Sequence, residues 1–274
     1  MPEISDQNLR GVAETLLLPL YIRALESKRP DAIIHDEKAV ALIQKIAYDS
    51  SWMNKMKVGE DDMVFIVLRN REFDRLAQDF LTRHPEAVVV HIGCGLDSRF
   101  ERVDNGQVEW YDLDLLEVIE LRRKLVGGER ERYHHISYSV FESDWLDEIK
   151  IHKPRPILFI AEGVFMYFKE AQAKGLVLSL HEQFPGAELA FDGVLPFIAW
   201  ANNLRFARAK IDARYHFTLK HGKDLEKWVD GIHLLNEWFF LDDPEPRLAK
   251  YQWMRHFPFL AKASGIYHYR LGQD

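Results

Sequence analysis

Two glycines separated by one residue directly follow a short, apolar and largely β-branched run. The run covers residues 87–92 (AVVVHI), and the glycines are Gly93 and Gly95. Glycine has no Cβ, so the chain can turn tightly there and the backbone can approach a ligand closely. In open α/β sheets, ligands bind just beyond the carboxyl ends of the strands. The two glycines therefore mark a candidate ligand-binding turn, although a purely structural turn explains them equally well when they are taken alone.

A pair of carboxylates follows the next strand-like run, about 20 residues beyond the glycines, at the spacing of the ribose-binding acid in dinucleotide-binding folds. Residues 108–111 (VEWY) lead into Asp112 and Asp114. A carboxylate at this place accepts hydrogen bonds from the two vicinal hydroxyls of a ribose. The glycine turn and the acidic pair together favour a cofactor that contains adenosine.

The third glycine position of the dinucleotide motif distinguishes between two such cofactors. In that motif a Gly or Ala packs a helix closely beneath a pyrophosphate. Here the position is Ser98, followed by Arg99 and Phe100. S-adenosylmethionine carries ribose and adenine but no phosphate, so it tolerates this departure. The sequence therefore favours S-adenosylmethionine, and a nicotinamide-dependent oxidoreductase is the alternative interpretation.

Charged residues that suit the methionine part of such a cofactor occur at two further places. Glu162 follows the apolar run 156–161 (PILFIA), and its carboxylate suits an ammonium or sulfonium group. Arg69 and Arg71 stand at the start of an amphipathic helical pattern. A guanidinium binds a carboxylate through two hydrogen bonds, so either arginine suits the methionine carboxylate. The alternative is a solvated strand-end glutamate and two surface arginines.

Several other kinds of chemistry are disfavoured. The single cysteine, Cys94, excludes an intrachain disulfide and a cysteine-based zinc cage, and we expect it to pack as a small apolar side chain. The adjacent histidines His134 and His135 lie in a strand pattern, where they point to opposite faces and cannot chelate a metal together. No His-Glu-x-x-His or Gly-x-Ser-x-Gly motif is present. With 36 Lys and Arg against 43 Asp and Glu, the net charge is −7, which argues against nucleic-acid binding.

Strand and helix patterns alternate along most of the chain. We expect strands at 87–92, 108–111, 133–138, 156–161, 188–192, 233–241 and 266–271, and helices at 36–47, 70–84, 115–125 and 173–184. This alternation predicts right-handed βαβ units and a parallel sheet with helices on both faces. The last strand is expected near the sheet edge, because its residues alternate. The aromatic and charged segment from 195 to about 230 is expected to form helices that cap the sheet edge.

The chain is expected to form a single domain over 1–274. Its parts are N-terminal lid helices (1–85), a cofactor core (86–194), a helical cap insertion (195–236) and C-terminal strands with a helix (237–274). No apolar stretch approaches the roughly 20 residues of a membrane span, and no signal-peptide pattern is visible. We therefore expect a soluble cytoplasmic protein that has no membrane partner. The sequence carries no signal for an oligomeric state.

Five motifs occur in an order that resembles a known family. They are residues 15–21 (TLLLPLY), 69–74 (RNREFD), 90–99 (VHIGCGLDSR), 110–115 (WYDLDL) and 159–163 (FIAEG). Together they resemble the leucine carboxyl methyltransferase family, whose bacterial branch is similar to tetracenomycin-type polyketide O-methyltransferases. The resemblance implies a class I methyltransferase fold of Rossmann-like α/β type. That fold has a mostly parallel seven-stranded sheet, helices on both faces and a helical cap. The implied methyl donor is S-adenosyl-L-methionine, and the implied product is S-adenosyl-L-homocysteine.

The resemblance also implies roles for individual residues. It places the methionine carboxylate near Arg69 or Arg71, the methionine moiety by Gly93 and Gly95, the ribose on Asp114, the amino-acid end near Glu162 and the adenine near Ser139 and Val140. Eukaryotic members tend to have an acidic residue in the adenine loop, and here Glu142 or Asp144 is the substitute. Glu72 stands where the family favours tyrosine.

The predicted function is methyl transfer to a carboxylate or hydroxyl oxygen of a small, polyketide-like molecule. The reaction is an in-line displacement, so the protein mainly orients the partners and excludes water. Tyr21 and Tyr167 are the acceptor-side candidates, and no residue is assigned as a general base. A minority of the aromatic residues between 197 and 240 is expected to line the acceptor pocket. A non-catalytic binding protein with a methyltransferase fold is a further alternative.

Overall fold

The computed structural model describes residues 13–46 and 58–272. Its N-terminal part consists of helices α1 (Ala13–Glu26), α2 (Glu37–Ile43) and α4 (Glu60–Arg83). Helix α4 begins ten residues before the predicted start, because its first turn carries three acidic residues that interact favourably with the amino end of a helix. One of them, Asp62, also accepts a 2.9 Å hydrogen bond from the Gly59 amide.

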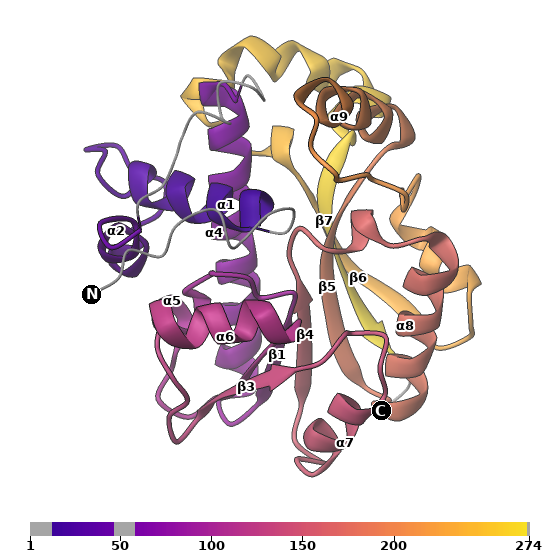
Figure 1. The fold of residues 1–274 in the computed structure, drawn as a ribbon. Coiled ribbons are helices and arrows are strands. Elements are labelled where there is room, and N and C mark those ends of the chain that lie inside the picture. The colour runs from indigo at the N-terminus through magenta and orange to yellow at the C-terminus, as the bar shows by residue number, and fades with distance from the viewer. Residues whose placement is uncertain (1–12, 47–57, 273–274) are drawn as a thin grey trace.

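Seven strands form one sheet in the order β3-β2-β1-β4-β5-β7-β6. The strands are β1 (Val88–Ile92), β2 (Glu109–Asp114), β3 (Tyr133–Ser137), β4 (Ile157–Ala161), β5 (Ala187–Val194), β6 (Ile232–Phe239) and β7 (Ser264–Leu271). The five strands from β3 to β5 are parallel, and β7 is antiparallel to both β5 and β6. The predicted α/β fold with a mostly parallel seven-stranded sheet is confirmed (Figure 1).

The last strand lies further inside the sheet than its alternating pattern indicates. Strand β7 is hydrogen-bonded on both sides, and β6 forms the edge. Both faces of β7 are covered, since successive residues such as Ile266 and Tyr267 are buried. In contrast, β6 exposes His233, Leu235 and Asn236. The alternation in β7 therefore does not reflect an exposed face.

Helices cover both faces of the sheet. Trp145 of α7 (Asp144–Lys150) and Val177 of α8 (Glu170–Gln183) share one core with Val88 and Val90 of β1. Phe73 of α4 and residues of α5 (Arg99–Val103) pack in a second core with Val89. Helix α6 (Leu116–Leu125) packs with α1 and α2 in a third. Since Val88, Val89 and Val90 are consecutive, the alternation of the strand separates the first two cores.

The cap is less helical than the sequence predicts. Its elements are η2 (Phe165–Tyr167), α9 (Pro196–Ala209), η3 (Gly222–Lys227), η4 (Phe240–Asp242), η5 (Pro246–His256) and α10 (Pro258–Ala261). Between α9 and η3 the chain is irregular, and the predicted boundary at 236 falls inside β6. Helix α9 and the gold 246–261 segment lie beyond the carboxyl ends of the parallel strands (Figure 1). Within the part of the chain that the structure describes, no helix is long and apolar enough to span a membrane.

A buried carboxylate on β5 makes stability depend on pH. Glu188 accepts hydrogen bonds from Arg83 at 2.8 and 3.0 Å and contacts His268 Nε2 at 2.7 Å. Burial opposes its ionisation, but these partners outweigh burial and lower the pKa of Glu188 to about 2. A carboxyl whose pKa is lowered on folding stabilises the fold above its unfolded pKa, and this stabilisation is lost as the pH falls through its folded pKa.

We therefore predict that Glu188→Gln lowers the free energy of unfolding at pH 7 by about 1–2 kcal/mol. The difference from the wild type should shrink between pH 4.5 and about 2, because only the wild type loses the contribution of Glu188 there. Urea unfolding at several pH values measures this difference. If the difference in the free energy of unfolding stays constant down to about pH 2, the lowered pKa assigned to Glu188 would be contradicted.

Candidate active site

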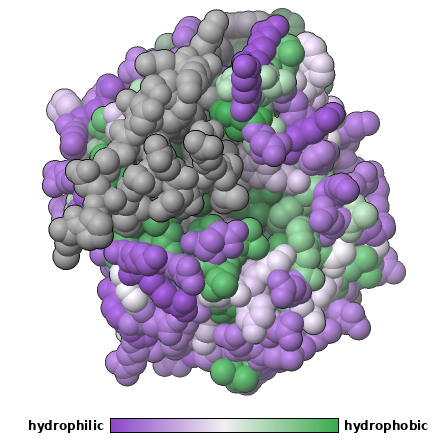
Figure 2. Space-filling model, in the orientation of Figure 1, coloured by the Kyte–Doolittle hydropathy of each residue, from purple (hydrophilic) through white to green (hydrophobic). Residues whose placement is uncertain are grey.

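A cavity of about 550 Å³ lies at the carboxyl ends of the parallel strands. Its floor contains the turn after β1, the residues after β4 and the end of β5. Helices α1, α4, α9 and α10 and the η5 segment contribute the other walls. Figure 2 shows apolar surface in a hollow near the centre of the molecule, as it is viewed in Figure 1. Adjacent parallel strands end at the same edge of the sheet, so residues far apart in the sequence meet here.

The turn after β1 strongly favours glycine at two positions. Gly93 and Gly95 have φ angles of +63° and +51°, in the left-handed region that side chains disfavour. A Cβ atom on Gly93 would lie 2.5 Å from Val164 Cγ2, and one on Gly95 would lie 2.8 Å from Leu16 Cδ2. Both glycines line the cavity, so the turn presents bare backbone to a ligand.

Asp114 stabilises this turn from the end of β2. Its two carboxylate oxygens accept 2.8 Å hydrogen bonds from the amides of Gly95 and Leu115. Burial raises the pKa of Asp114, and these two amides oppose that effect. Asp114 thus lies beside the turn but is not part of the cavity wall.

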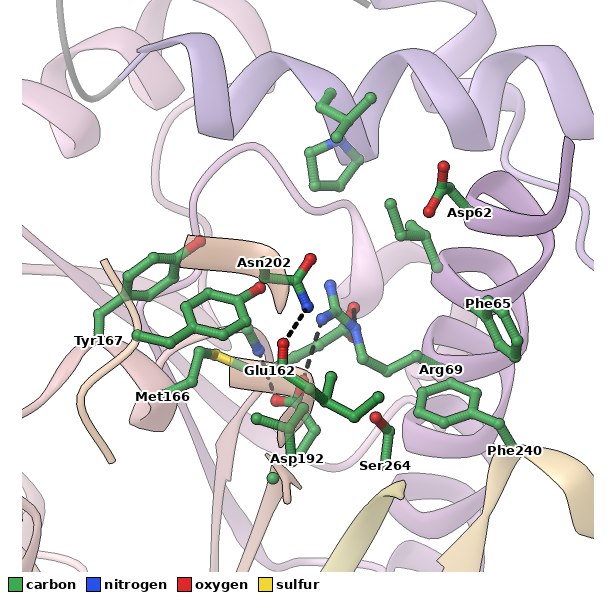
Figure 3. A pocket seen from close by; sticks show the side chains of 18 of the residues that line it. Asp62, Phe65, Arg69, Glu162, Met166, Tyr167, Asp192, Asn202, Phe240 and Ser264 are labelled. Carbon is green, nitrogen blue, oxygen red and sulfur yellow. Dashed lines mark hydrogen bonds and ion pairs between the residues drawn. The ribbon is translucent and has the colours of Figure 1, made fainter. Parts of the chain in front are cut away.

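The two candidate arginines of α4 point in different directions. Arg69 lines the cavity, where its Nε lies 2.9 Å from Glu162 Oε1 and its Nη1 lies 3.0 Å from Asp192 Oδ2 (Figure 3). Arg71 is two residues further along, about 200° around the helix axis. It pairs with Asp243 and is not part of the cavity wall. Helix geometry therefore brings one of the two arginines to the site.

Glu162 has three hydrogen-bond donors around its carboxylate. Its carboxylate accepts hydrogen bonds from Arg69, Asn70 and Arg99. Burial disfavours its charge, but the guanidinium groups of Arg99 and Arg69 outweigh burial and lower the pKa of Glu162. The carboxylate is therefore ionised at neutral pH and suited to bind a cationic group.

Asp192 is a site residue that the sequence analysis missed. It lies in β5 and lines the cavity, and it accepts hydrogen bonds from the Gly163 amide at 2.6 Å and from Arg69. Burial raises the pKa of Asp192 despite the charge of Arg69. A signal was present, since Asp192 follows the apolar residues of its strand much as Glu162 follows those of β4.

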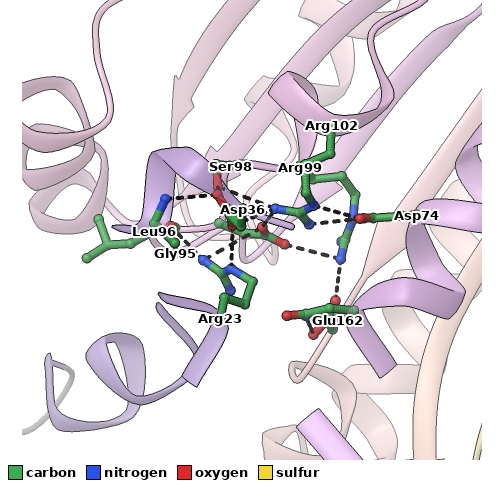
Figure 4. A network of polar contacts seen from close by, with 12 residues as sticks. Arg23, Asp36, Asp74, Gly95, Leu96, Ser98, Arg99, Arg102 and Glu162 are labelled. Carbon is green, nitrogen blue, oxygen red and sulfur yellow. Dashed lines mark hydrogen bonds and ion pairs between the residues drawn. The ribbon is translucent and has the colours of Figure 1, made fainter. Parts of the chain in front are cut away.

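A buried network of arginines and carboxylates lies behind the turn (Figure 4). Arg102 contacts Asp74 at 2.6 Å and Asp36 at 2.9 Å, and Arg99 contacts Asp74 at 2.7 Å. Arg23 of α1 pairs with Asp36 at 2.9 Å and donates to the Leu96 carbonyl at 3.0 Å. The network therefore connects α1 and α4 to the turn after β1.

The start of α5 is poorly suited to a pyrophosphate. Ser98 precedes this five-residue helix, and its hydroxyl contacts both oxygens of Asp36 at 2.7 Å. Asp97 is also buried there, and the charges of Arg102, Arg99 and Arg23 outweigh burial and lower the pKa of Asp97. The start of this short helix is thus occupied by buried carboxylates that are already paired with arginines, which makes it a poor site for a pyrophosphate and argues against a nicotinamide cofactor.

The residues assigned to adenine lie in the loop after β3, away from the cavity wall. The Ser139 amide donates to Glu142 Oε1 at 2.9 Å, and the Val140 carbonyl accepts from Trp145 Nε1 at 3.2 Å. The Glu142 carboxylate therefore accepts a hydrogen bond from within its own loop. The intervening Phe141 is 47% exposed, with its ring edge against Phe168.

One of the two acceptor-side candidates lines the cavity, and the other lies outside its wall. Tyr167 lines the cavity, with its ring 5.2 Å from the ring of Tyr215 at an angle of 80°. Tyr21 lies on α1 and is partly buried outside the cavity wall. Cys94 lines the cavity, and burial raises the pKa of its thiol well above the usual value. It is therefore a packed thiol rather than a thiolate.

The remaining wall of the cavity is mainly apolar. Its members include Leu18, Pro19, Phe65, Ile66, Ile198, Phe206, Phe240, Leu241, Met254 and Leu260. They come from α1, α4, α9, η4, η5 and α10. Among the aromatic residues between 197 and 240, Phe206, Tyr215 and Phe240 line the cavity, whereas Trp200 is largely exposed.

The chain matches known proteins over most of its length. Residues 17–180 match the family model for leucine carboxyl methyltransferase. The tetracenomycin polyketide synthesis O-methyltransferase TcmP of Streptomyces glaucescens is 37% identical over 86% of each chain. The S-adenosyl-L-methionine-dependent methyltransferase dpfgK of Gibberella zeae is 26% identical over 91% of this chain and 89% of its own.

Two solved structures share the fold at low sequence identity. A DUF574 family protein from Streptomyces avermitilis has a TM-score of 0.56 at 15% identity, covering 92% of this chain and 96% of its own. A structure described as a putative methyltransferase from Thermobifida fusca has a TM-score of 0.55 at 11% identity, covering 92% and 94%.

Proposed function

Because the chain belongs to the leucine carboxyl methyltransferase family, we propose that it transfers the methyl group of S-adenosylmethionine to a carboxylate oxygen of an apolar small molecule. The observation that carries this proposal is the composition of one cavity. It combines a glycine turn, the ion-paired Arg69 and Glu162, and a wide apolar wall.

The residues at the turn fit the cofactor. Gly93, Gly95 and Gly163 all have positive φ angles, and a Cβ on any of them would meet a neighbouring side chain at 3.3 Å or less. We propose that Arg69 binds the carboxylate of the methionine moiety and that Glu162 binds its ammonium group. The bare turn accommodates the rest of that moiety.

The other predicted cofactor residues lie outside the cavity wall. We propose that Asp114 binds the ribose and that the backbone at Ser139 and Val140 binds the adenine, since both places adjoin carboxyl ends of strands. Arg71 is not proposed as a ligand, because it pairs with Asp243.

When bound, S-adenosylmethionine supplies a methyl group on a sulfonium, which is already a good electrophile. The protein therefore mainly orients the acceptor and excludes water. A carboxylate acceptor is ionised at neutral pH and needs no general base, whereas an alcohol or phenol benefits from one.

The acidic and phenolic side chains of the cavity wall favour the acceptor that needs no base. The acidic residues among the described lining residues are Asp62, Asp97, Glu162 and Asp192, and each is paired with an arginine. Burial raises the pKa of Tyr167 well above its usual value and also raises that of Tyr215. Both phenols are therefore protonated at neutral pH and are poor bases.

We predict that Tyr167→Phe changes kcat by less than about threefold, because a general base contributes roughly 10²–10⁴-fold and a phenol held protonated contributes no base catalysis. Initial rates of label transfer from methyl-tritiated S-adenosylmethionine measure the effect. Tyr251→Phe, which removes a hydrogen bond to Asp61, is the matched control. A loss of about a hundredfold specific to Tyr167→Phe would identify this residue as the base and contradict the proposal.

One experiment distinguishes the two kinds of oxygen acceptor. The protein is incubated with methyl-tritiated S-adenosylmethionine and a set of aromatic carboxylic acids, each matched with a phenol of the same ring system. Alkali hydrolyses a methyl ester to volatile tritiated methanol, whereas a methyl ether keeps its label. We expect base-labile label with the acids, and label that survives alkali on the phenols alone would overturn the carboxylate assignment.

A further inference from the structure

Large aromatic side chains gather on the outside of the cap. Trp200 of α9 is 69% exposed, and Trp253, Phe257 and Phe259 of the 246–261 segment are each more than half exposed. Single exposed apolar residues are common, but four aromatic ones within two neighbouring segments form a patch that indicates an interaction site.

One ring contact joins the two segments, and a second lies within the 246–261 segment. The ring centroids of Phe197 and Phe259 are 4.9 Å apart, and those of Trp253 and Phe257 are 5.9 Å apart. Phe197, Trp200 and Leu204 are spaced by three and four residues, so they share one side of α9. We call the six residues Phe197, Trp200, Leu204, Trp253, Phe257 and Phe259 the aromatic face.

Helix α9 has apolar residues on both of its sides, although only one side packs inward. The residues that line the cavity include Ile198, Asn202 and Phe206. A surface helix ordinarily carries polar residues on its outer side. The outer side of α9 is therefore built for a contact that residues 13–46 and 58–272 do not make.

Exposed basic side chains adjoin the aromatic face in a protein that is acidic as a whole. Residues 196–211 and 246–262 contain seven Lys and Arg and no Asp or Glu, and four of the seven (Arg205, Arg247, Lys250 and Lys262) pair with acids outside these segments. The net charge of the whole chain is −7. Arg208, Lys210 and Arg255 are exposed beside the aromatic residues. The charge complementary to this surface is negative.

We propose that the aromatic face docks the protein on an anionic lipid surface. Trp and Phe residues next to Lys and Arg are typical of segments that lie in the membrane interface, where rings enter the headgroup region and cations meet anionic lipids. A second copy of the chain is disfavoured, because two identical basic faces repel each other. Four of the rings are more than half exposed, which leaves them open to contact with a lipid surface.

The aromatic face lies on the same two segments that form part of the cavity wall. Ile198, Met254 and Leu260 line the cavity from the same two segments. A docked molecule would thus have the apolar wall of its cavity close to the lipid, from which an apolar acceptor can enter. This consequence rests on the proposed function, whereas the docking itself does not.

The test is co-sedimentation of the full chain with vesicles of phosphatidylcholine, with and without phosphatidylglycerol. We expect binding to the anionic vesicles that weakens as salt is added. The variant Phe257→Ser/Phe259→Ser should lower the partition coefficient at least about tenfold, because two rings leave the interface. Arg208→Gln/Arg255→Gln should weaken binding to the anionic vesicles. Ile151→Ser, at a 76% exposed site after α7, is the matched control and should bind like the wild type.

Three results would overturn the proposal. They are no sedimentation with anionic vesicles, an equal loss in the Ile151→Ser control, and concentration-dependent self-association that disappears in Phe257→Ser/Phe259→Ser. Binding of S-adenosylhomocysteine is measured on the same variants and should not change, since neither ring lines the cavity. If vesicle binding fails while cofactor binding persists, the docking proposal falls and the proposed function stands.

Discussion

Arg69→Ala is expected to weaken S-adenosylmethionine binding by about 2–4 kcal/mol, roughly thirty- to several hundredfold. The reason is that Arg69 is the cavity-lining guanidinium that reaches both Glu162 and Asp192. Without it, a ligand carboxylate loses its cation and meets two buried acids instead. Equilibrium dialysis with labelled S-adenosylmethionine measures the change in Kd.

Arg71→Ala is the matched control, because Arg71 lies two residues away on the same helix and pairs with Asp243 outside the cavity wall. We expect it to change the Kd by less than about threefold, while the lost ion pair lowers stability modestly. Arg69→Lys should recover part of the affinity, since it restores the charge but not the bidentate geometry. If Arg71→Ala weakened binding more than Arg69→Ala, the assignment of the two arginines would be wrong.

Arg122→Met is expected to lower the free energy of unfolding by about 3–5 kcal/mol, a large share of the stability of a typical domain. Arg122 is buried and pairs with Asp112, which is also buried. It also donates to the carbonyls of Gly95 and Asp97 at 2.8 and 2.5 Å. The substitution therefore leaves one buried carboxylate without its cation and two carbonyls of the glycine turn without their donor. Urea unfolding followed by tryptophan fluorescence measures the loss.

The adjacent Arg123 provides the control for Arg122. It is 42% exposed in a surface pair with Glu129, so Arg123→Met should cost less than about 1 kcal/mol. Combining Arg122→Met with Asp112→Asn should recover about 1–2 kcal/mol, because the double variant buries no unpaired charge. A double variant less stable than Arg122→Met alone would show that the loss arises from packing rather than from the ion pair.

The sequence predicts the parts of this protein that local patterns determine. Continuous apolar runs identify the central parallel strands β1 and β4, and the residues after them identify the turn at Gly93 and Gly95 and the acid at Glu162. These predictions succeed because a buried parallel strand needs apolar residues on both faces and because ligand sites lie at strand ends. The family and the fold followed from the same residues.

The features that the sequence does not predict depend on tertiary geometry. The choice between Arg69 and Arg71 needs the rotation of α4 against the sheet, which residue types do not specify. The network around Asp36 and Asp74 joins residues dozens of positions apart. Strand β7 resembles an edge strand because its sequence alternates, yet it pairs on both sides. In each case a contact between distant residues overrides the local pattern.

The central claim is that the cavity beside the glycine turn binds S-adenosylmethionine. Calorimetric titration of the purified, cofactor-free protein with S-adenosylhomocysteine tests it most directly, with Arg69→Ala and NADH as comparisons. We predict saturable binding at one site per chain, a marked loss in Arg69→Ala, and no binding of NADH. An absence of binding to folded wild-type protein, or equal binding of NADH, would contradict the claim.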